Sequence, residues 1–299
     1  MVELNEILNL KFYKGEDLYS DGDVEDEILK ICKSGQDIQE LLRSTDRWPL
    51  LYHLSDVREN VLDWYGFDPE ANLLEIGAGC GAISGLFCRK VKRVVAIDLS
   101  KRRSTINAVR NGGMGNLEIL VGNFEDIEIE EKFDYVTLIG VLEYSGYYIS
   151  KGADPYEAML KKVKKFLKPG GRLIIAIENK FGLKYWGGAA EDHTGGFFDG
   201  IEDYRKVDGV RTFSRPEITQ LLKSAGFSEN TFYYPMPDYK LPDTVYSDEF
   251  LPKPGMLEHV TDVYDRERFV LFNESSAYDA LIRDGQFPYF ANSFLIISR

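Results

Sequence analysis

Between residues 72 and 177, short runs of apolar and β-branched residues alternate with longer segments whose apolar residues recur at helical spacing. The predicted strands are Asn72–Ile76, Arg93–Ile97, Leu117–Val121, Phe133–Ile139 and Arg172–Ile177. The predicted helices between them are Ala82–Lys90, Lys101–Asn111 and Pro155–Leu167, the last stopped by Lys168-Pro169-Gly170-Gly171. Strands and helices that alternate in this way form βαβ units with a parallel sheet. The pattern therefore predicts an α/β fold: an open, doubly wound, mostly parallel sheet with helices on both faces.

The flanks of this core carry a different pattern. Residues 1–65 are predicted to be a helical N-terminal extension, which is either a lid over the open edge of the sheet or a packing appendage. Residues 66–299 form the main domain, with insertions at about 179–213 and 235–287. A helix at Arg215–Ala225 and strands at Asn230–Tyr234 and Tyr289–Ile297 complete it. Insertions of this length are usually functional or disordered, and these two follow strand ends, where the ligand crevice of an open α/β sheet lies.

Composition and charge limit the binding partners and the cellular location that we expect for this protein. The chain has 36 basic and 49 acidic residues among 299, for a net charge of −13, which disfavours broad nucleic-acid binding. The lysines near residues 161–168 are expected to form a solvated helix face. The sequence contains no apolar run long enough to span a membrane and no signal peptide, and its three cysteines have no metal-like spacing. We therefore expect a cytoplasmic protein.

A glycine-rich turn follows the first strand of the core, in Glu75-Ile76-Gly77-Ala78-Gly79-Cys80-Gly81. Glycine is needed where the chain turns tightly and a ligand approaches the backbone. Gly77-x-Gly79-x-x-Ala82 also fits the looser dinucleotide fingerprint, and any tight strand-to-helix turn could use such residues. The loop alone therefore leaves the ligand open.

Three further features follow the next strands. Asp98, followed by Leu99, ends the second strand, where an acid can accept both hydroxyl protons of a ribose; as a helix cap it would be redundant, since Ser100 fills that role. Asn123 and Phe124 follow the third strand and could contact an adenine edge and ring, or form a simple turn. The segment Gly140-Val141-Leu142-Glu143-Tyr144 follows the fourth strand and would line the crevice near the reacting centre.

Taken in order, these motifs over residues 72–177 resemble the class I, Rossmann-like, S-adenosylmethionine-dependent methyltransferases. The resemblance implies a seven-stranded sheet whose final strand is antiparallel. It also implies that the glycine loop abuts the methionine part of the cofactor, that the second-strand acid binds its ribose, and that the third-strand turn binds adenine. The cofactor-binding residues implied here are Glu75, Gly77, Ala78, Gly79, Gly81, Asp98, Leu99, Asn123, Phe124, Gly140 and Val141. Asn123 is a departure, because the family often has Asp there.

Arg58, in the N-terminal extension, is a further candidate for cofactor binding. Its guanidinium could pair with the methionine carboxylate in a bidentate manner. The alternative is a surface salt bridge to Asp56, Glu59 or Asp63.

Candidate catalytic residues follow from the needs of methyl transfer, which requires alignment and removal of a proton from a hydroxyl or amine acceptor. His193 is the first candidate, because nearby acids, Glu191 and Asp192, could orient its imidazole and the surrounding glycines let a loop close. Glu143 and Tyr144 are second choices. Tyr185 and Trp186 are predicted to contact the substrate. No metal is expected, because the sequence shows no tight acid–histidine cluster.

The C-terminal half is similar to bacterial methyltransferases encoded among sugar-transfer and cell-surface glycan genes. The residues that carry this similarity lie in Asn179–Gly196, Thr212–Arg215 and Tyr233–Pro242. It implies a small-molecule or glycan-precursor acceptor. Two alternatives stay open: an NAD(P)-dependent oxidoreductase, and a module that binds the cofactor without catalysis.

Overall fold

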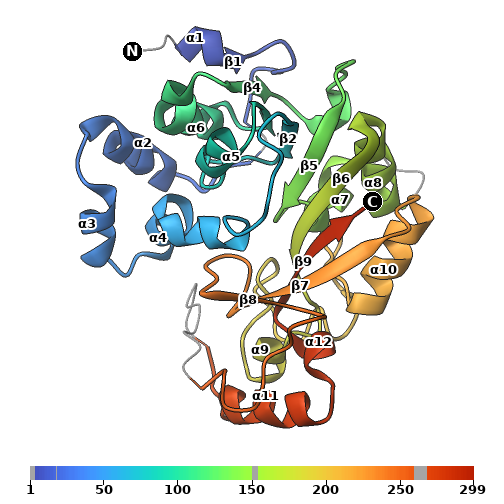
Figure 1. Cartoon of the computed structure of the whole chain (residues 1–299). Coiled ribbons are helices and arrows are strands. Elements are labelled where there is room, and N and C mark those ends of the chain that lie inside the picture. Colours follow the sequence, from blue (N-terminus) through green and yellow to red (C-terminus); the bar gives the residue numbers. More distant parts are fainter. Residues whose placement is uncertain (1–3, 18, 150–153, 259–267) are drawn as a thin grey trace. The chain divides into compact units, whose positions relative to one another are not determined.

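The computed structural model describes residues 4–17, 19–149, 154–258 and 268–299 (Figure 1). The chain divides into two compact units. The first comprises Met1–Leu138 and Phe166–Arg172, and the second comprises Ile139–Lys165 and Leu173–Arg299. Parts of two predicted segments, residues 1–3 and 18 of the N-terminal extension and 259–267 of the second insertion, lie outside the described residues.

The first unit is built on five parallel strands in the order β1-β4-β3-β2-β5. Their bounds are β1 Leu8–Asn9, β2 Asn72–Ile76, β3 Arg93–Asp98, β4 Leu117–Val121 and β5 Phe133–Ile139. In the register of the ladder, Leu74 of β2 lies between Val95 of β3 and Val136 of β5. These strands are almost wholly buried, and their unbroken apolar runs are typical of a parallel sheet covered on both faces.

Helices of the first unit follow the predicted periodicity. The helices and 3-10 turns within or beside the sheet are α1 Leu4–Ile7, α5 Ser84–Lys90, α6 Lys101–Asn111, η2 Gly112–Met114 and η3 Phe124–Asp126. The Ser100 side chain caps α6 by accepting a hydrogen bond from the Arg103 amide at 3.2 Å, as predicted. Asp17 reinforces this end, because its carboxylate also accepts hydrogen bonds from the first two amides of the helix.

The N-terminal helices pack into the same unit. They are α2 Val24–Ser34, α3 Ile38–Arg43, α4 Trp48–Leu54 and the 3-10 helix η1 Asp56–Val61, drawn in blue in Figure 1. Ile28 and Leu54 are buried in one apolar cluster with Ile106 of α6 and with Cys80 of the glycine loop. Residues 24–61 are largely helical, and α2 packs against α6. Whether these helices open as a lid stays a prediction.

The second unit contains the strand order β6-β9-β7-β8. Their bounds are β6 Leu167–Glu178, which enters this unit at Leu173, β7 Asn230–Met236, β8 Thr244–Ser247 and β9 Ser293–Ser298. Strand β9 is antiparallel to both neighbours, with Ile296 beside Ile175 of β6 and Phe232 of β7. The helices are η4 Leu142–Tyr144, α7 Ser145–Tyr148, α8 Pro155–Phe166, α9 Leu183–Trp186, α10 Arg215–Ser224, α11 Glu274–Arg283 and α12 Phe287–Phe290.

The prediction of seven strands is wrong: the described residues contain nine. The two extra strands, β1 and β8, have two and four residues and lie at the ends of the strand order, too short to give a period-two pattern. The last strand also begins at Ser293 instead of Tyr289, because Phe287–Phe290 form a helical turn with Pro288 near its start. The α/β class, the mostly parallel sheet and the antiparallel final strand are as predicted. None of the helices in the described part of the chain is both long and apolar enough to cross a membrane.

Candidate functional site

The glycine loop of the first unit adopts a backbone that demands glycine. Gly77, Gly79 and Gly81 have φ angles of 73°, 54° and 75°, in the left-handed region that other residues rarely adopt. The amides of Gly77 and Ala78 donate to the Ile97 carbonyl at 2.8 and 3.0 Å, which ties the loop to the end of β3. Beside Gly79 the space that a Cβ would occupy is open except for an Arg103 nitrogen at 3.8 Å. A ligand can therefore approach the backbone there.

Asp98 joins the loop to β3. One of its carboxylate oxygens accepts a hydrogen bond from the Gly79 amide at 2.7 Å, and the other accepts one from the Ser100 amide at 2.9 Å. Burial raises the pKa of this carboxyl, although Arg103 and the two amides oppose the rise. Each oxygen keeps a second lone pair, so the carboxylate can accept a ribose hydroxyl as predicted. The neighbouring Leu99 is half-buried.

Glu75 is held in a buried polar network under the loop. The Ser84 hydroxyl donates to its carboxylate at 2.5 Å and accepts from the Asn107 amide at 2.9 Å. Asn111 in turn donates to the Gly81 carbonyl at 2.9 Å. Burial raises the pKa of Glu75 to about 8, with a further rise from Asp98. Sequence reasoning missed Ser84, Asn107 and Asn111, because a polar residue on the inner face of a helix has no signal until its partner is known.

Asn123 and Phe124, both predicted to bind the ligand, have structural roles in the turn after β4. The Asn123 side chain accepts a hydrogen bond from the Glu125 amide at 3.0 Å and so caps η3. The Phe124 ring is buried and lies 5.5 Å from the Phe166 ring, measured between ring centroids. The simple turn is thus present; the adenine contact stays a prediction.

Arg58 is buried rather than at the surface, with 4% of its area exposed. Its guanidinium carbon lies 4.2 Å from the centre of the Tyr52 ring, and its charge lowers the pKa of Glu75, opposing the rise from burial. Two of the acids considered as surface partners bind other bases: Glu59 pairs with Arg89, and Asp63 pairs with Lys90. This burial argues against the surface salt bridge. Cofactor binding by Arg58 stays a prediction.

The remaining predicted residues lie in the second unit. Gly140, with φ of 69°, donates its amide to the Ala176 carbonyl at 2.9 Å and so holds the segment after β5 against β6. A Cβ at Gly140 would lie 2.8 Å from the Tyr239 hydroxyl, so no larger residue fits. Val141 is half-buried.

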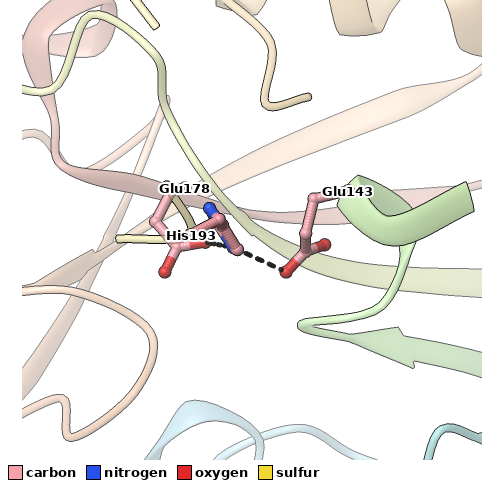
Figure 2. A group of neighbouring side chains, drawn as sticks. All are labelled: Glu143, Glu178 and His193. Carbon is pink, nitrogen blue, oxygen red and sulfur yellow. Dashed lines mark ion pairs between the residues drawn. The ribbon is translucent and has the colours of Figure 1, made fainter. Parts of the chain in front are cut away.

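His193 is the centre of a buried group of carboxylates in this unit (Figure 2). Its Nδ1 lies 2.8 Å from Glu191 Oε1, and its Nε2 lies 3.5 Å from Glu143 Oε1 and 3.7 Å from Glu178 Oε2. The Tyr144 ring packs edge-on against the imidazole at 5.2 Å between centroids. The structure therefore brings together all three predicted catalytic residues, and Glu191 orients the imidazole as expected.

The ionisation of this group follows from its burial. Burial by itself lowers the pKa of His193, but the nearby carboxyl groups of Glu143 and Glu191 outweigh it and raise that pKa well above its usual value. Burial raises the pKa of Glu143, whereas the His193 hydrogen bond outweighs burial at Glu191 and lowers the pKa of that carboxyl. This arrangement of carboxyl groups therefore favours the protonated, imidazolium form of His193.

A second layer of charges surrounds the group. Lys240 Nζ lies 2.8 Å from Glu178 Oε1 and also pairs with Asp192, and Lys184 Nζ lies 2.8 Å from another oxygen of Asp192. Tyr185, predicted to contact substrate, is buried and donates its hydroxyl to Asp192. Trp186, predicted with it, is 41% exposed. Substrate contact by either residue stays a prediction.

Sequence reasoning missed Glu178 and Lys240. Both belong to the buried group although they are separated by 62 positions, and no local pattern marks a contact of that length. The expectation that the chain offers no tight acid–histidine cluster is wrong. Glu143, Glu178 and His193 place one ligand atom each within 4.8 Å of one another.

Comparison with known proteins finds a family model that is similar to the part of the chain that holds the glycine loop and Asp98. Residues 74–175 match the model described as a methyltransferase domain. A probable protein arginine N-methyltransferase 6 of Arabidopsis thaliana is 27% identical over 182 residues, or 58% of this chain and 37% of that protein. The malonyl-acyl-carrier-protein O-methyltransferase of Priestia megaterium is 26% identical over 119 residues, or 39% of this chain and 40% of that protein. The chain thus spans about two fifths of the length of these two curated relatives.

Among solved structures, phosphoethanolamine N-methyltransferase 1 of Haemonchus contortus, in complex with phosphoethanolamine and S-adenosylhomocysteine, is similar in fold. The TM-score is 0.50 at 12% identity, over 92% of this chain and 48% of that one. The fold and the family match agree with the order of motifs in the sequence. Residues 74–175 of this chain are therefore similar to a methyltransferase domain in sequence, and the fold is that of known methyltransferases.

Proposed function

We propose that this protein is a methyltransferase that uses S-adenosylmethionine as the donor and a small molecule or glycan precursor as the acceptor. The observation that carries the proposal is the pairing of Asp98 with the Gly79 amide inside the matched domain. This hydrogen bond holds the Asp98 carboxylate at the end of β3 beside the glycine loop at the end of β2, where three glycines have left-handed φ angles. An adenosyl ligand needs such an arrangement, with a carboxylate for ribose hydroxyls and a backbone that a ligand can approach closely.

The residues of the first unit fit the donor. The open space beside Gly79 admits a ligand, and Asp98 retains acceptor capacity for hydroxyl groups. Asp98 places a carboxylate beside the loop, which suits a donor that carries a sulfonium and an ammonium group. When bound, S-adenosylmethionine supplies an electrophilic methyl group. The chain has to orient the acceptor and hold the proton that the acceptor loses.

We assign proton handling to the buried group of the second unit. Among the three predicted catalytic residues, Glu143 has the properties of a proton acceptor, because burial raises its pKa and neither carboxylate oxygen accepts a hydrogen bond from the described residues. His193, an imidazolium held by Glu191, acts as a positioning group for it. Tyr185 and Trp186 remain the proposed contacts of the acceptor.

The acceptor class rests on the similarity of the C-terminal half to methyltransferases encoded among glycan genes. The arginine and acyl-carrier-protein methyltransferases named above act on other acceptors, so the class needs a direct test. The oxidoreductase alternative is disfavoured by the match to a methyltransferase domain over residues 74–175. A binding module without catalysis would bind the donor and turn over no acceptor.

Calorimetric titration with S-adenosylmethionine and S-adenosylhomocysteine tests the donor. The native chain should bind both, and Asp98→Asn should weaken binding by about 10- to 150-fold, as for a lost hydrogen bond to a charged group worth about 1.5–3 kcal/mol. The matched control is Asp126→Asn, a carboxylate of the same unit that pairs with Lys14 and that we assign no ligand. Folded protein that binds neither compound would remove the proposal.

A further inference from the structure

Three side chains of the second unit converge from separate segments. Glu143 belongs to η4, Glu178 ends β6, and His193 lies in the long connection between α9 and α10. Figure 2 shows the imidazole joined by ion-pair lines to both carboxylates. One ligand atom from each residue lies within 4.8 Å of the other two. Three ligand atoms at this spacing can coordinate one ion after a small inward movement.

Glu143 gives an independent reason to expect a ligand. Its side chain is 1% exposed, and neither of its oxygens makes a hydrogen bond to any described residue. The nearest cationic atom recorded is His193 Nε2 at 3.5 Å, well beyond the roughly 2.7–2.9 Å of a charge-assisted hydrogen bond. Burying a carboxylate without close partners is costly, so this oxygen pair is poised for a cation.

His193 is oriented as metal-binding histidines are. Glu191 accepts at Nδ1, and its other oxygen accepts the backbone amides of His193 and Thr194, both at 2.7 Å. The Tyr204 hydroxyl also donates to Glu191, at 3.0 Å. A carboxylate fixed in this way keeps the proton on Nδ1, an arrangement common around zinc and other metals. An ion that binds at Nε2 therefore displaces only the Nε2 proton of the imidazolium, which leaves to solvent.

The charge of the surroundings favours an added cation. Five buried or nearly buried carboxyl groups belong to this part of the second unit: Glu143, Glu178, Glu191, Asp192 and Asp238. The basic groups that pair with them among the described residues are Lys184, Lys240 and His193. Lys240 binds Glu178 through Oε1, which leaves Oε2 directed at His193. A divalent ion would offset the excess of negative charge without displacing either lysine.

Burial decides between a metal ion and an organic ammonium group. The side chains of Glu143, Glu178 and His193 are 1%, 0% and 5% exposed. An ion needs only the space between the three ligand atoms, whereas an organic cation needs room for its carbon chain as well. Metal–ligand distances of about 2.1 Å place tetrahedral ligands about 3.4 Å apart. The separations of 3.5 and 3.7 Å from His193 Nε2 to the two carboxylates are close to this value, and all three ligand atoms lie within 4.8 Å of one another.

We propose that Glu143, Glu178 and His193 form a binding site for one divalent transition-metal ion, with Glu191 holding the imidazole in place. The imidazole ligand favours Zn²⁺, Mn²⁺ or Fe²⁺ over Mg²⁺ and Ca²⁺, which prefer oxygen ligands alone. The role of this ion rests on the methyltransferase proposal. The ion would bind the oxygen of an acceptor hydroxyl and lower the pKa of that hydroxyl, and it would replace Glu143 as the group that assists loss of the proton.

The test uses the full chain, stripped with EDTA, dialysed and titrated with ZnCl2 or MnCl2 by calorimetry. One ion per chain is expected for at least one of the two metals. Glu143→Gln should weaken binding at least tenfold, and Glu191→Gln should weaken it about 10- to 100-fold, as for other groups that orient a ligand. The matched control is Glu118→Gln, a carboxylate of β4 that pairs with Arg93 in the first unit, and it should bind like the native chain.

Spectroscopy of the native chain keeps the test independent of whether the variants fold. X-ray absorption of the zinc form should show one imidazole and oxygen ligands. Failure of the folded native chain to bind either metal, sulfur ligation, or full affinity in Glu143→Gln would overturn the site. Binding of ethylammonium in place of both metals would also overturn it, in favour of an organic cation. None of these measurements uses S-adenosylmethionine, so they stand apart from the donor titration.

Discussion

Replacement of Glu75 by Gln should change how the stability of the first unit depends on pH. The Glu75 carboxyl is buried beneath the glycine loop, and burial raises its pKa from 4.5 to about 8. The protonated acid is therefore the form that the folded chain prefers. Gln has the same shape, remains neutral, and keeps an oxygen that can accept the Ser84 hydroxyl. The substitution removes the ionisation and preserves the packing.

The magnitude follows from linkage between protonation and folding. A group whose pKa is raised on folding gives its full stabilisation below the unfolded pKa, near 4.5, and loses it as the pH rises through about 8. Between these values the folded state binds more protons than the unfolded state, so the free energy of unfolding falls by up to about 1.4 kcal/mol per pH unit. Over the whole interval the loss reaches about 5 kcal/mol relative to Gln.

Urea denaturation at pH 5, 6, 7 and 8 measures this difference. The chain has three tryptophans, Trp48 and Trp64 in the first unit and Trp186 in the second. A Trp186→Phe background therefore makes tryptophan fluorescence report on the first unit alone. The native-minus-variant difference in unfolding free energy should decline steadily with pH for Glu75→Gln. It should stay flat for the control, Glu118→Gln, on strand β4 of the same sheet.

Parallel stability curves for the native chain and Glu75→Gln from pH 5 to 8 would refute the reasoning. That result would mean that Glu75 ionises in the folded chain as easily as in water. A difference that grows with pH would refute it more strongly, since it would require the charged carboxylate to be the form stabilised by Ser84 and Arg58.

Three further substitutions test the packing around the sites. Gly81→Ala should destabilise the first unit by about 2–4 kcal/mol and abolish donor binding, because φ is 75° and the new Cβ would clash with Asn107 Oδ1. Chemical denaturation and donor titration measure the two effects, and wild-type values in both would contradict the prediction. Ile28→Ala should cost about 2–5 kcal/mol in urea denaturation, as for a fully buried core residue, and a cost below that range would show that α2 is loosely packed. Tyr185→Phe should cost about 1–3 kcal/mol by removing the donor to Asp192, measured by thermal and urea unfolding of the second unit; no loss would mean that the lysines satisfy that carboxylate alone.

Local sequence determined the strands of the core and the chemistry of the loop between them. Three strands have the predicted bounds: Asn72–Ile76, Leu117–Val121 and Phe133–Ile139. A strand that is buried on both faces is an unbroken run of apolar residues, so the sequence marks it whatever its position in the sheet. The glycines at 77, 79 and 81 are equally local, since a left-handed φ restricts the residue itself. The Ser100 cap is also local, because its partner lies three positions away.

Edge elements were harder to predict. Strand β1 has two residues and β8 has four, so neither carries a period of its own, and both exist through pairing with a longer neighbour. The start of β9 was misplaced for a related reason. Apolar residues at Tyr289 and Phe290 suit a strand as well as a helical turn, and tertiary packing of Phe287 decided for the turn.

In the buried group of the second unit, the sequence determined one contact of His193 and the tertiary structure decided the others. The sequence by itself determined that acids beside His193 orient its ring, because Glu191 lies two positions away and reaches back to the same turn. Only the tertiary structure decided that Glu143 and Glu178 meet the other face of that ring, from segments 50 and 15 positions distant. The physical reason is that backbone geometry and short-range hydrogen bonds are properties of neighbouring residues. A cluster of buried charges instead depends on which distant segments exclude water together.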